Sequence, residues 1–277
     1  MSSGSLRVIS PGNAAAAARP PDWRRLLRTR TTGFALVALL LLAWEASVAW
    51  GWVRSDNWPR FSDVLLALWR GWASGELAGV IGSTLYRTFA GFFLGSALGI
   101  AMGVLLGRTA WLDWTLRPLV EIQRTLPAPA LLPPLILLLG VDDALKIVVI
   151  ALAVLPPVFV NTYSGVKATD ETLILTARTL GLSRVATMWK IVLPASAPAI
   201  AAGMRTALAL ALVVAVIAEM ISGTNGIGFH LMTMQYAMRA GDMYAAVVSI
   251  AAAGYLMNRV FLSAEKRLLH WHASSRV

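Results

Sequence analysis

Long apolar segments dominate the chain, and polar residues gather between these segments rather than alternating with them. Several segments with few or no charges reach the roughly 20 residues that a helix needs to cross a hydrocarbon core of about 30 Å. We therefore predict an all-α polytopic membrane protein with six transmembrane helices. The expected spans cover residues 33–53, 85–106, 117–139, 145–166, 199–221 and 243–262.

The main interruption of this pattern is the polar stretch 167–197, between spans 4 and 5. No Gly or Pro occurs from Thr172 to Leu180, so a short helix is expected there. Gly181 can end this helix, because glycine adopts the left-handed C-terminal cap without steric cost.

A second helix is expected after this turn. Ser183 can cap its N-terminus, and the helix would run toward Leu193. Pro194 and Pro198 are expected to stop it and to start span 5, since a proline inside a helix removes a backbone donor. The stretch is thus predicted to be a helix–turn–helix.

Glycines recur every fourth residue in span 2, at Gly91, Gly95, Gly99, Gly103 and Gly107. This spacing places bare backbone along one helix face, where another helix can approach closely. We interpret the repeat as a helix-packing surface, with a groove that lines a substrate pathway as the alternative.

The middle of span 3 is dense in prolines, at positions 127, 129, 133 and 134. They predict a broken helix, and broken backbone at membrane depth is tolerated inside protein or along a wet cavity. In the segment 54–80, Ser62 can cap a short surface helix. The apolar side expected for that helix carries Leu65, Leu66, Leu68 and Trp69.

Polar side chains inside the spans are the candidate functional residues. Arg205 and Glu219 fit either a gating or binding role or structural pairing. Asn161 and Thr162 are expected to hydrogen-bond between helices, with lining of the pathway as the alternative. Arg87, at the outer end of span 2, is expected to snorkel toward the membrane surface.

Charge gives the orientation of the spans. The net charge is +10, and in a membrane protein basic residues flank the spans on the cytoplasmic side. One side holds the N-terminal arginines and Arg108, Arg117, Lys167, Arg178, Arg184, Lys190, Lys266, Arg267 and Arg276; the other holds Arg54, Arg60, Arg70, Lys146 and Arg239. The richer side is predicted to be cytoplasmic. It contains the N-terminal tail 1–32, the loop 167–197 and the C-terminal tail 263–277.

The residue inventory narrows the chemistry. The chain has no cysteine, which excludes disulfides and thiolate sites. His270 and His272 have no carboxylate or cysteine nearby, so they are a poor metal site. The apolar run at the N-terminus is too long for the core of a cleaved signal peptide. We predict no catalytic residue and no metal site.

The loop resembles that of importer permeases of the ATP-binding-cassette class. Their loop reads Glu-Ala-Ala, three residues, Gly, nine residues, Ile, one residue and Leu-Pro. Ala177, Gly181, Ile191, Leu193 and Pro194 match at that spacing, whereas Leu175 and Thr176 replace the first two residues.

Further motifs extend the resemblance from about Trp44 to Trp271. It is closest to the branch that imports sulfonates, taurine and nitrate. The motifs are Ser74-Gly75-Glu76-Leu77, Arg87 with Gly91, Arg124-Thr125-Leu126-Pro127, Pro134-Leu135, Gly140, Asn161-Thr162, Gly203 with Arg205, Ala218-Glu219-Met220 and Gly226-Ile227-Gly228.

The resemblance implies a transport subunit of the cell membrane with both termini cytoplasmic. It implies a homodimer that works with a separate ATPase, which binds ATP and Mg, and with a periplasmic or tethered solute-binding protein. The loop 169–194 would couple to the ATPase, with contacts from Leu175, Thr176, Ala177, Leu180, Gly181, Ile191, Leu193 and Pro194. Membrane lipid is the other expected partner, and nucleic acid is not.

The sequence agrees with this division of labour, because it has no phosphate-cradling Gly-Lys-Ser/Thr loop of its own. An ion-gradient-driven secondary transporter, or an importer permease for an uncharged vitamin or pyrimidine precursor, remains the alternative. A membrane enzyme would need clustered His, Asp or Glu, and a channel would need a charged or carbonyl ring; neither is found in the sequence.

Overall fold

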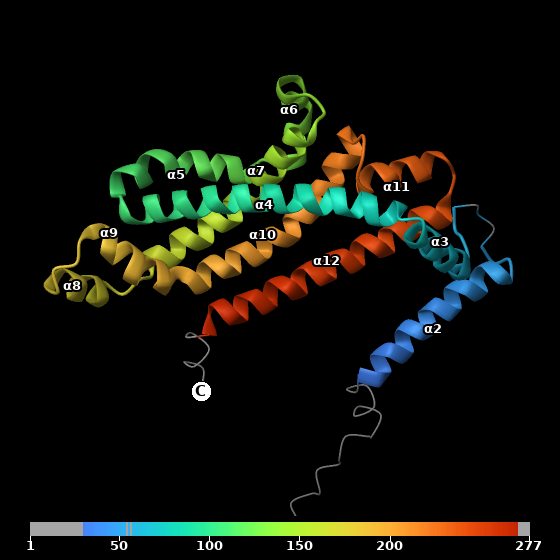
Figure 1. The fold of residues 1–277 in the computed structure, drawn as a ribbon, viewed down its shortest axis with the longest axis horizontal. Helices are drawn as coiled ribbons and strands as arrows, with labels where there is room; N and C mark the ends of the chain where they lie inside the picture. The colour runs from blue at the N-terminus through green and yellow to red at the C-terminus, as the bar shows by residue number, and fades with distance from the viewer. Residues whose placement is uncertain (1–29, 54, 56, 271–277) are drawn as a thin grey trace, which may run out of the picture. The chain divides into compact units, whose positions relative to one another are not determined.

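The computed structural model describes residues 30–53, 55 and 57–270, and within these residues every regular element is a helix (Figure 1). Side chains are described from Gly33 on. Most of the predicted N-terminal tail, and His272 in the C-terminal tail, lie outside this part of the chain. Two compact units are present, residues 1–54 and 55–277, and each is described on its own.

The first unit contains one described helix, α2 (Arg30–Ala49). Its apolar part, Gly33–Ala49, has 17 residues. This length falls short of the usual 20 or so residues of a full span. The predicted first span is therefore present as a helix, and its crossing of the membrane stays a prediction.

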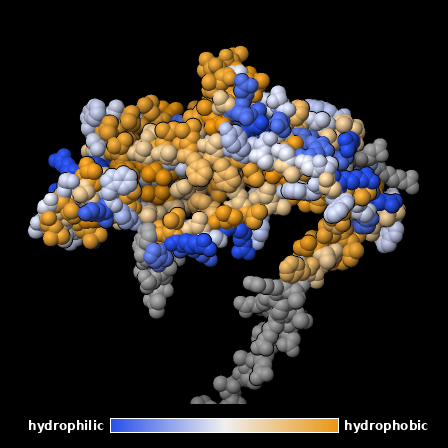
Figure 2. All heavy atoms as spheres, viewed as in Figure 1, coloured by the Kyte–Doolittle hydropathy of each residue, from blue (hydrophilic) through white to orange (hydrophobic). Residues whose placement is uncertain are grey.

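The second unit holds four helical segments long and apolar enough to cross a membrane. These are α4 (Glu76–Arg108), α7 (Asp143–Lys167), the continuous stretch Arg184–Ser222 and α12 (Ala240–Leu268). Figure 2 shows hydrophobic side chains across the middle of this unit, with hydrophilic ones toward the ends near α8–α9 and near α3 and α11.

The predicted span 3 is broken, as its prolines indicated. It consists of α5 (Ala110–Thr125), the 3₁₀ turn η1 (Ala128–Leu131) and α6 (Leu132–Leu139), with a bend of 95° between the two halves. Counting this pair as one span gives five candidates at most, so the predicted total of six is not confirmed.

Helix α7 is the centre of the second unit, because it packs against both α4 and α10 (Leu193–Ser222). Val149, Val154 and Val158 of α7 are fully buried there. They form one apolar core with Phe92 of α4 and Ala211 of α10.

The five repeated glycines of α4 lie against α7 in sequence order. A Cβ atom on Gly95 would lie 2.5 Å from the carbonyl oxygen of Ala151, and one on Gly103 would lie 2.6 Å from Cβ of Thr162. Real Cβ atoms do not approach other atoms this closely, so bare backbone is what allows the two helices to touch.

The helix after the polar turn runs on directly into span 5, so the predicted stop at Pro194 and Pro198 is wrong. Helix α9 (Arg184–Thr187) continues through a π-helical turn, η2 (Met188–Val192), into α10. In this wide turn Leu193 N–H donates to the carbonyl of Met188. A π turn relieves the crowding of a proline ring on the preceding turn, which explains how Pro194 is accommodated.

Two further predictions are corrected. Helix α3 (Phe61–Ala73) follows Arg60, so Ser62 lies in its first turn and does not cap it. Val64 and Ala67 face the protein, whereas Leu65, Leu66 and Trp69 are exposed. The segment 223–242, which has no predicted helix between the expected spans 199–221 and 243–262, contains the helix α11 (Ile227–Tyr236).

Candidate functional site

The α8 segment (Glu171–Thr179) lies at one end of the second unit, where α7 ends and α9 begins (Figure 1). The Asp170 carboxylate caps its N-terminus by accepting hydrogen bonds from the backbone N–H of Thr172 at 2.8 Å and its hydroxyl at 2.7 Å. These bonds favour the charged carboxylate and lower the pKa of Asp170.

The C-terminus of α8 closes on Gly181, whose φ of +72° places it in the left-handed region. Leu182 N–H donates to the carbonyl of Ala177 at 3.0 Å, and Gly181 N–H donates to that of Arg178 at 3.0 Å. This is the Schellman pattern that the sequence predicted from the glycine. Both ends of α8 are thus fixed by local hydrogen bonds.

The predicted coupling residues fall on two sides of the segment. Leu175, Thr176, Leu180, Gly181 and Pro194 are exposed, and Leu180 is 75% exposed. Ala177, in contrast, is buried together with Ile174.

Helix α8 packs against α9 and η2. The buried Ala177 therefore cannot itself touch a docking partner. Ile191 and Leu193 are half-buried.

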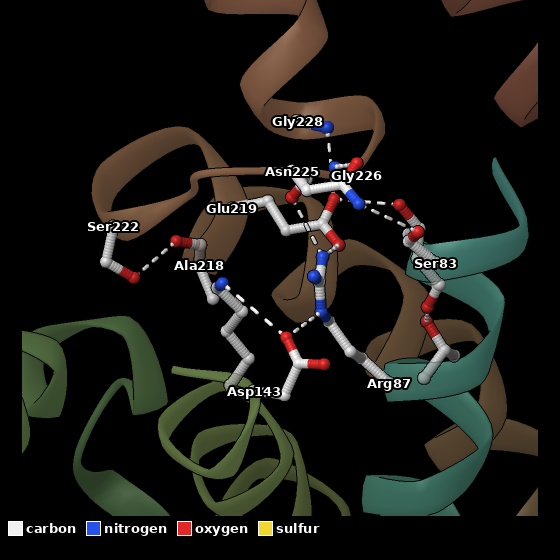
Figure 3. Close-up of polar contacts among 12 residues, drawn as sticks. Ser83, Arg87, Asp143, Ala218, Glu219, Ser222, Asn225, Gly226 and Gly228 are labelled. Atoms are coloured by element: carbon white, nitrogen blue, oxygen red, sulfur yellow. Dashed lines mark hydrogen bonds and ion pairs between the residues drawn. The ribbon is translucent and has the colours of Figure 1, made fainter. Parts of the chain in front are cut away.

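A buried ion-pair cluster lies at the opposite ends of α7 and α10 (Figure 3). Arg87 of α4 donates from Nη1 to Oε1 of Glu219 at 2.7 Å and from Nε to Oδ1 of Asp143 at 2.8 Å. Arg87 is 4% exposed and Glu219 is fully buried. The expectation that Arg87 snorkels is therefore wrong, because a buried carboxylate 132 positions away neutralises it.

The same cluster fastens the turn before α11. Arg87 Nη1 also donates to the carbonyl of Asn225 at 2.8 Å, and Gly228 N–H donates to Oε2 of Glu219 at 3.1 Å. Thr84 donates its hydroxyl to that Oε2 at 2.8 Å and accepts from Ile227 N–H at 2.9 Å. One carboxylate thereby ties together α4, α10 and this turn.

The sequence pointed to Glu219 and Arg87, but not to the other members of this cluster, Thr84, Asp143 and Lys146. Thr84 and Asp143 both precede the predicted spans 85–106 and 145–166, and nothing in the sequence marks them as members of a cluster. Lys146 is 1% exposed, with Nζ 3.9 Å from Asp143 Oδ1. Its position three residues after Asp143 was the only feature of the sequence that could have indicated this pair, because such residues are neighbours on a helix.

Arg205 is not part of this cluster. It forms a two-pronged ion pair with Glu265, which joins α10 to α12. Arg205 and Glu219 thus each form an ion pair between helices, which is the structural alternative expected from the sequence.

A groove of about 530 Å³ opens beside the break between α5 and η1 and is also lined by α7 and α10. Asn161 lines it, although its side chain donates within its own helix, to the Pro157 carbonyl at 2.8 Å. Thr162 faces away against Gly103, and its buried hydroxyl has no hydrogen-bond partner. Neither side chain makes the interhelical hydrogen bond expected from the sequence.

Gln123 supports the wall of this groove. Its amide donates to the carbonyl of Leu152 at 2.7 Å. That carbonyl would normally accept from residue 156 of the helix, but Pro156 has no N–H to donate. The glutamine of the broken span therefore replaces a missing backbone bond of α7.

Comparison with known proteins assigns this architecture to a family. Residues 95–269 match the family described as binding-protein-dependent transport system inner membrane component. The chain belongs to this family.

Relatives of similar length support the assignment. The putative aliphatic sulfonates transport permease protein SsuC of Escherichia coli (strain K12) is 32% identical over 233 residues, which cover 84% of this chain and 89% of that protein. The protein of the same description from Bacillus subtilis (strain 168) is 30% identical, over 87% and 88% of the two chains. The riboflavin transport system permease protein RibX of Chloroflexus aurantiacus is 30% identical, over 85% and 88%.

A solved structure agrees with the fold. The MetNI methionine ABC transporter in an inward-facing conformation matches with a TM-score of 0.60 and 22% identity, over 70% of this chain and 94% of that chain. The protein is thus a membrane permease subunit of an ATP-binding-cassette importer, and it is not an enzyme. This membership favours the importer over the ion-gradient-driven alternative.

Proposed function

We propose that this permease carries a small sulfonate, such as an alkanesulfonate or taurine, into the cell. The relatives named for aliphatic sulfonates match most of their length, and the taurine transport system permease protein TauC of Escherichia coli (strain K12) is 31% identical over 57% of this chain. Nitrate or a similar anion fits the same class. An uncharged vitamin is the second candidate, favoured by the similarity to RibX.

We propose that the groove beside the break between α5 and η1 is this chain's part of the translocation pathway. Arg124 and Asn161 give it polar atoms on otherwise apolar walls, and the arginine suits an anionic solute. The apolar tips of α6, where Leu137 is 88% and Leu138 is 78% exposed, would be covered by a second copy of the chain in a homodimer.

We infer that α8 docks on the separate ATPase, which binds ATP and Mg. The observation that carries this inference is the pairing of fixed helix ends with exposed apolar side chains at Leu175 and Leu180. A short helix held this way moves as a rigid body. Because α8 packs against α9, which continues without a break into α10, motion of the ATPase would reach the groove directly.

The excess of basic residues around α8 favours a cytoplasmic position for this end, with both termini on that side. The Arg87–Glu219 cluster then lies at the outer face. It would fix the turn before α11 in a shape that a periplasmic or tethered solute-binding protein can contact.

Uptake by proteoliposomes that contain the permease, its ATPase and its binding protein tests the proposal. We expect ATP-dependent accumulation of radiolabelled taurine or ethanesulfonate and none of riboflavin. Leu175→Asp with Leu180→Asp should abolish uptake and co-purification of the ATPase. Thr179→Asp, an exposed change on the same helix, serves as the control for added charge. Accumulation without any ATPase would contradict the coupling role.

A further inference from the structure

Three arginines converge on a small pocket beside α8. The pocket has a volume of about 370 Å³ and lies between the turn that joins α4 to α5, helix α8 and the α9–η2 turn. Arg108 is the last residue of α4, directly before this turn, Arg178 lies in α8 and Arg184 is the first residue of α9. The site is therefore assembled from segments distant in the sequence.

None of these three arginines forms an ion pair with another described residue, although several other basic residues of the same unit do. Lys167 pairs with Asp113 at 2.9 Å, Arg117 pairs with Glu121 at 3.1 Å, and Arg205 pairs with Glu265. Three guanidinium groups around one hollow repel one another unless an anion lies between them.

The position of the pocket indicates where its anion comes from. Arg108 is the last residue of the membrane-length helix α4, and Arg184 is the first residue of the membrane-length stretch that contains α10. About 20 helical residues already cross the hydrocarbon core, so the end residues of these 33- and 39-residue segments lie at or beyond its polar edge, on the side of the lipid headgroups.

The lining of the pocket combines charged and apolar side chains. The apolar side chains of Ile174, Met188 and Val192 line it together with the arginines. An amphiphile with a phosphate head fits such a lining better than a fully hydrated ion does. Arginine is also the side chain whose planar fork matches phosphate oxygens.

We propose that this pocket binds a phosphate-bearing anion, the headgroup of an acidic phospholipid in the surrounding membrane. The bound headgroup joins α8 to the α4–α5 turn through Arg178 and Arg108. The membrane composition thereby influences how firmly the docking helix is held. This inference does not depend on the identity of the transported solute.

Lipid binding to the purified full-length chain tests the proposal. Native mass spectrometry would count bound phosphatidylglycerol, with phosphatidylcholine of the same acyl chains as the neutral probe. We expect the wild-type chain to retain phosphatidylglycerol selectively. The variant R108Q/R178Q/R184Q should bind it about tenfold more weakly or worse, since each basic residue near the surface contributes to the attraction.

The matched control removes the same charge elsewhere. R259Q/K266Q/R267Q takes three basic residues from the C-terminal part of α12 and should leave the binding unchanged. The variant R108K/R178K/R184K keeps the charge and serves if R108Q/R178Q/R184Q does not fold. It should bind with intermediate strength, because lysine lacks the planar fork of arginine.

Competition with inorganic phosphate distinguishes the source of the anion. Phosphatidylglycerol that phosphate does not displace identifies the headgroup. Arginine-dependent binding of phosphate alone would keep the phosphate site and overturn the lipid assignment. Equal lipid retention by the wild-type chain and R108Q/R178Q/R184Q would overturn the proposal. Loss of ATPase co-purification in that variant, with lipid binding unchanged, would instead identify a protein-docking surface and also overturn it.

Discussion

Arg87 and Glu219 form a fully enclosed ion pair between α4 and α10, with 2.7 Å between Nη1 and Oε1. The pair is almost fully shielded from water, because only 4% of the arginine side chain and none of the glutamate side chain is exposed. Removal of such charges from water costs several kcal/mol each, which close geometry and further hydrogen bonds must offset. Both conditions are met, since Thr84, Asn225 and Gly228 complete the contacts.

Arg87→Met should lower the free energy of unfolding in mixed micelles by about 3–5 kcal/mol, because it leaves Glu219 buried without its counter-charge. The double variant Arg87→Met with Glu219→Leu should regain most of that loss. Arg239→Met removes the exposed pair with Asp242 and should cost less than about 1 kcal/mol. An equally small cost for Arg87→Met would refute the enclosed-pair account.

The sequence predicted what depends on local pattern. Membrane-length apolar runs located the long helices of the second unit, and Gly181 located the end of α8 correctly. The sequence did not reveal which ionisable residues meet, because Arg87 and Glu219 approach only after α4 and α10 pack on α7. Both stood inside apolar runs, and this shared feature was the usable signal for a pair.

The continuous helix through Pro194 was missed for a different reason. Proline commonly ends or kinks a helix, because its ring clashes with the preceding turn. Here the wide π-helical turn before Pro194 relieves that clash. Nothing in the residues from Met188 to Val192 themselves marks a π-helical turn. In the groove, Asn161 donates to the carbonyl four residues earlier in its own helix, a local contact that competes with a hydrogen bond to another helix.

Gly95→Ala should separate α4 from α7, since the added methyl group would lie 2.5 Å from the backbone oxygen of Ala151. We expect a clear loss of thermal stability in detergent. Gly82→Ala is the matched control on the same helix, where no atom lies within 4 Å of the added group. That substitution should stabilise the helix by up to about 1 kcal/mol through its higher helix propensity. Equal melting temperatures for the two variants would argue against close packing at Gly95.

Gln123→Leu should destabilise the protein by about 1–3 kcal/mol, the usual cost of a buried carbonyl without a donor. Pro156→Ala restores the backbone N–H that can donate to Leu152. In the Pro156→Ala background the glutamine should therefore matter much less, and a double-mutant cycle measures this coupling. Additive effects of the two substitutions would show that Gln123 does not act through the Leu152 carbonyl.

The cap of α8 should be sensitive to acid. The pKa of Asp170 is lowered by its bonds to Thr172, so the folded state binds this proton more weakly than the unfolded state. The resulting stability is present above the ordinary aspartate pKa of 3.8 and is lost as the pH falls through the lower folded value. Hydrogen-exchange protection in the first turn of α8 should fall in that window.

Two substitutions at this cap separate its charge from its geometry. Asp170→Asn keeps a good capping group but has no proton to gain, so protection of α8 should become independent of pH in this range. Thr172→Val removes the hydroxyl donor, which should move the acid loss to higher pH because the pKa of Asp170 returns toward its ordinary value. A pH profile of Asp170→Asn identical to that of the wild-type chain would assign the acid effect to another group.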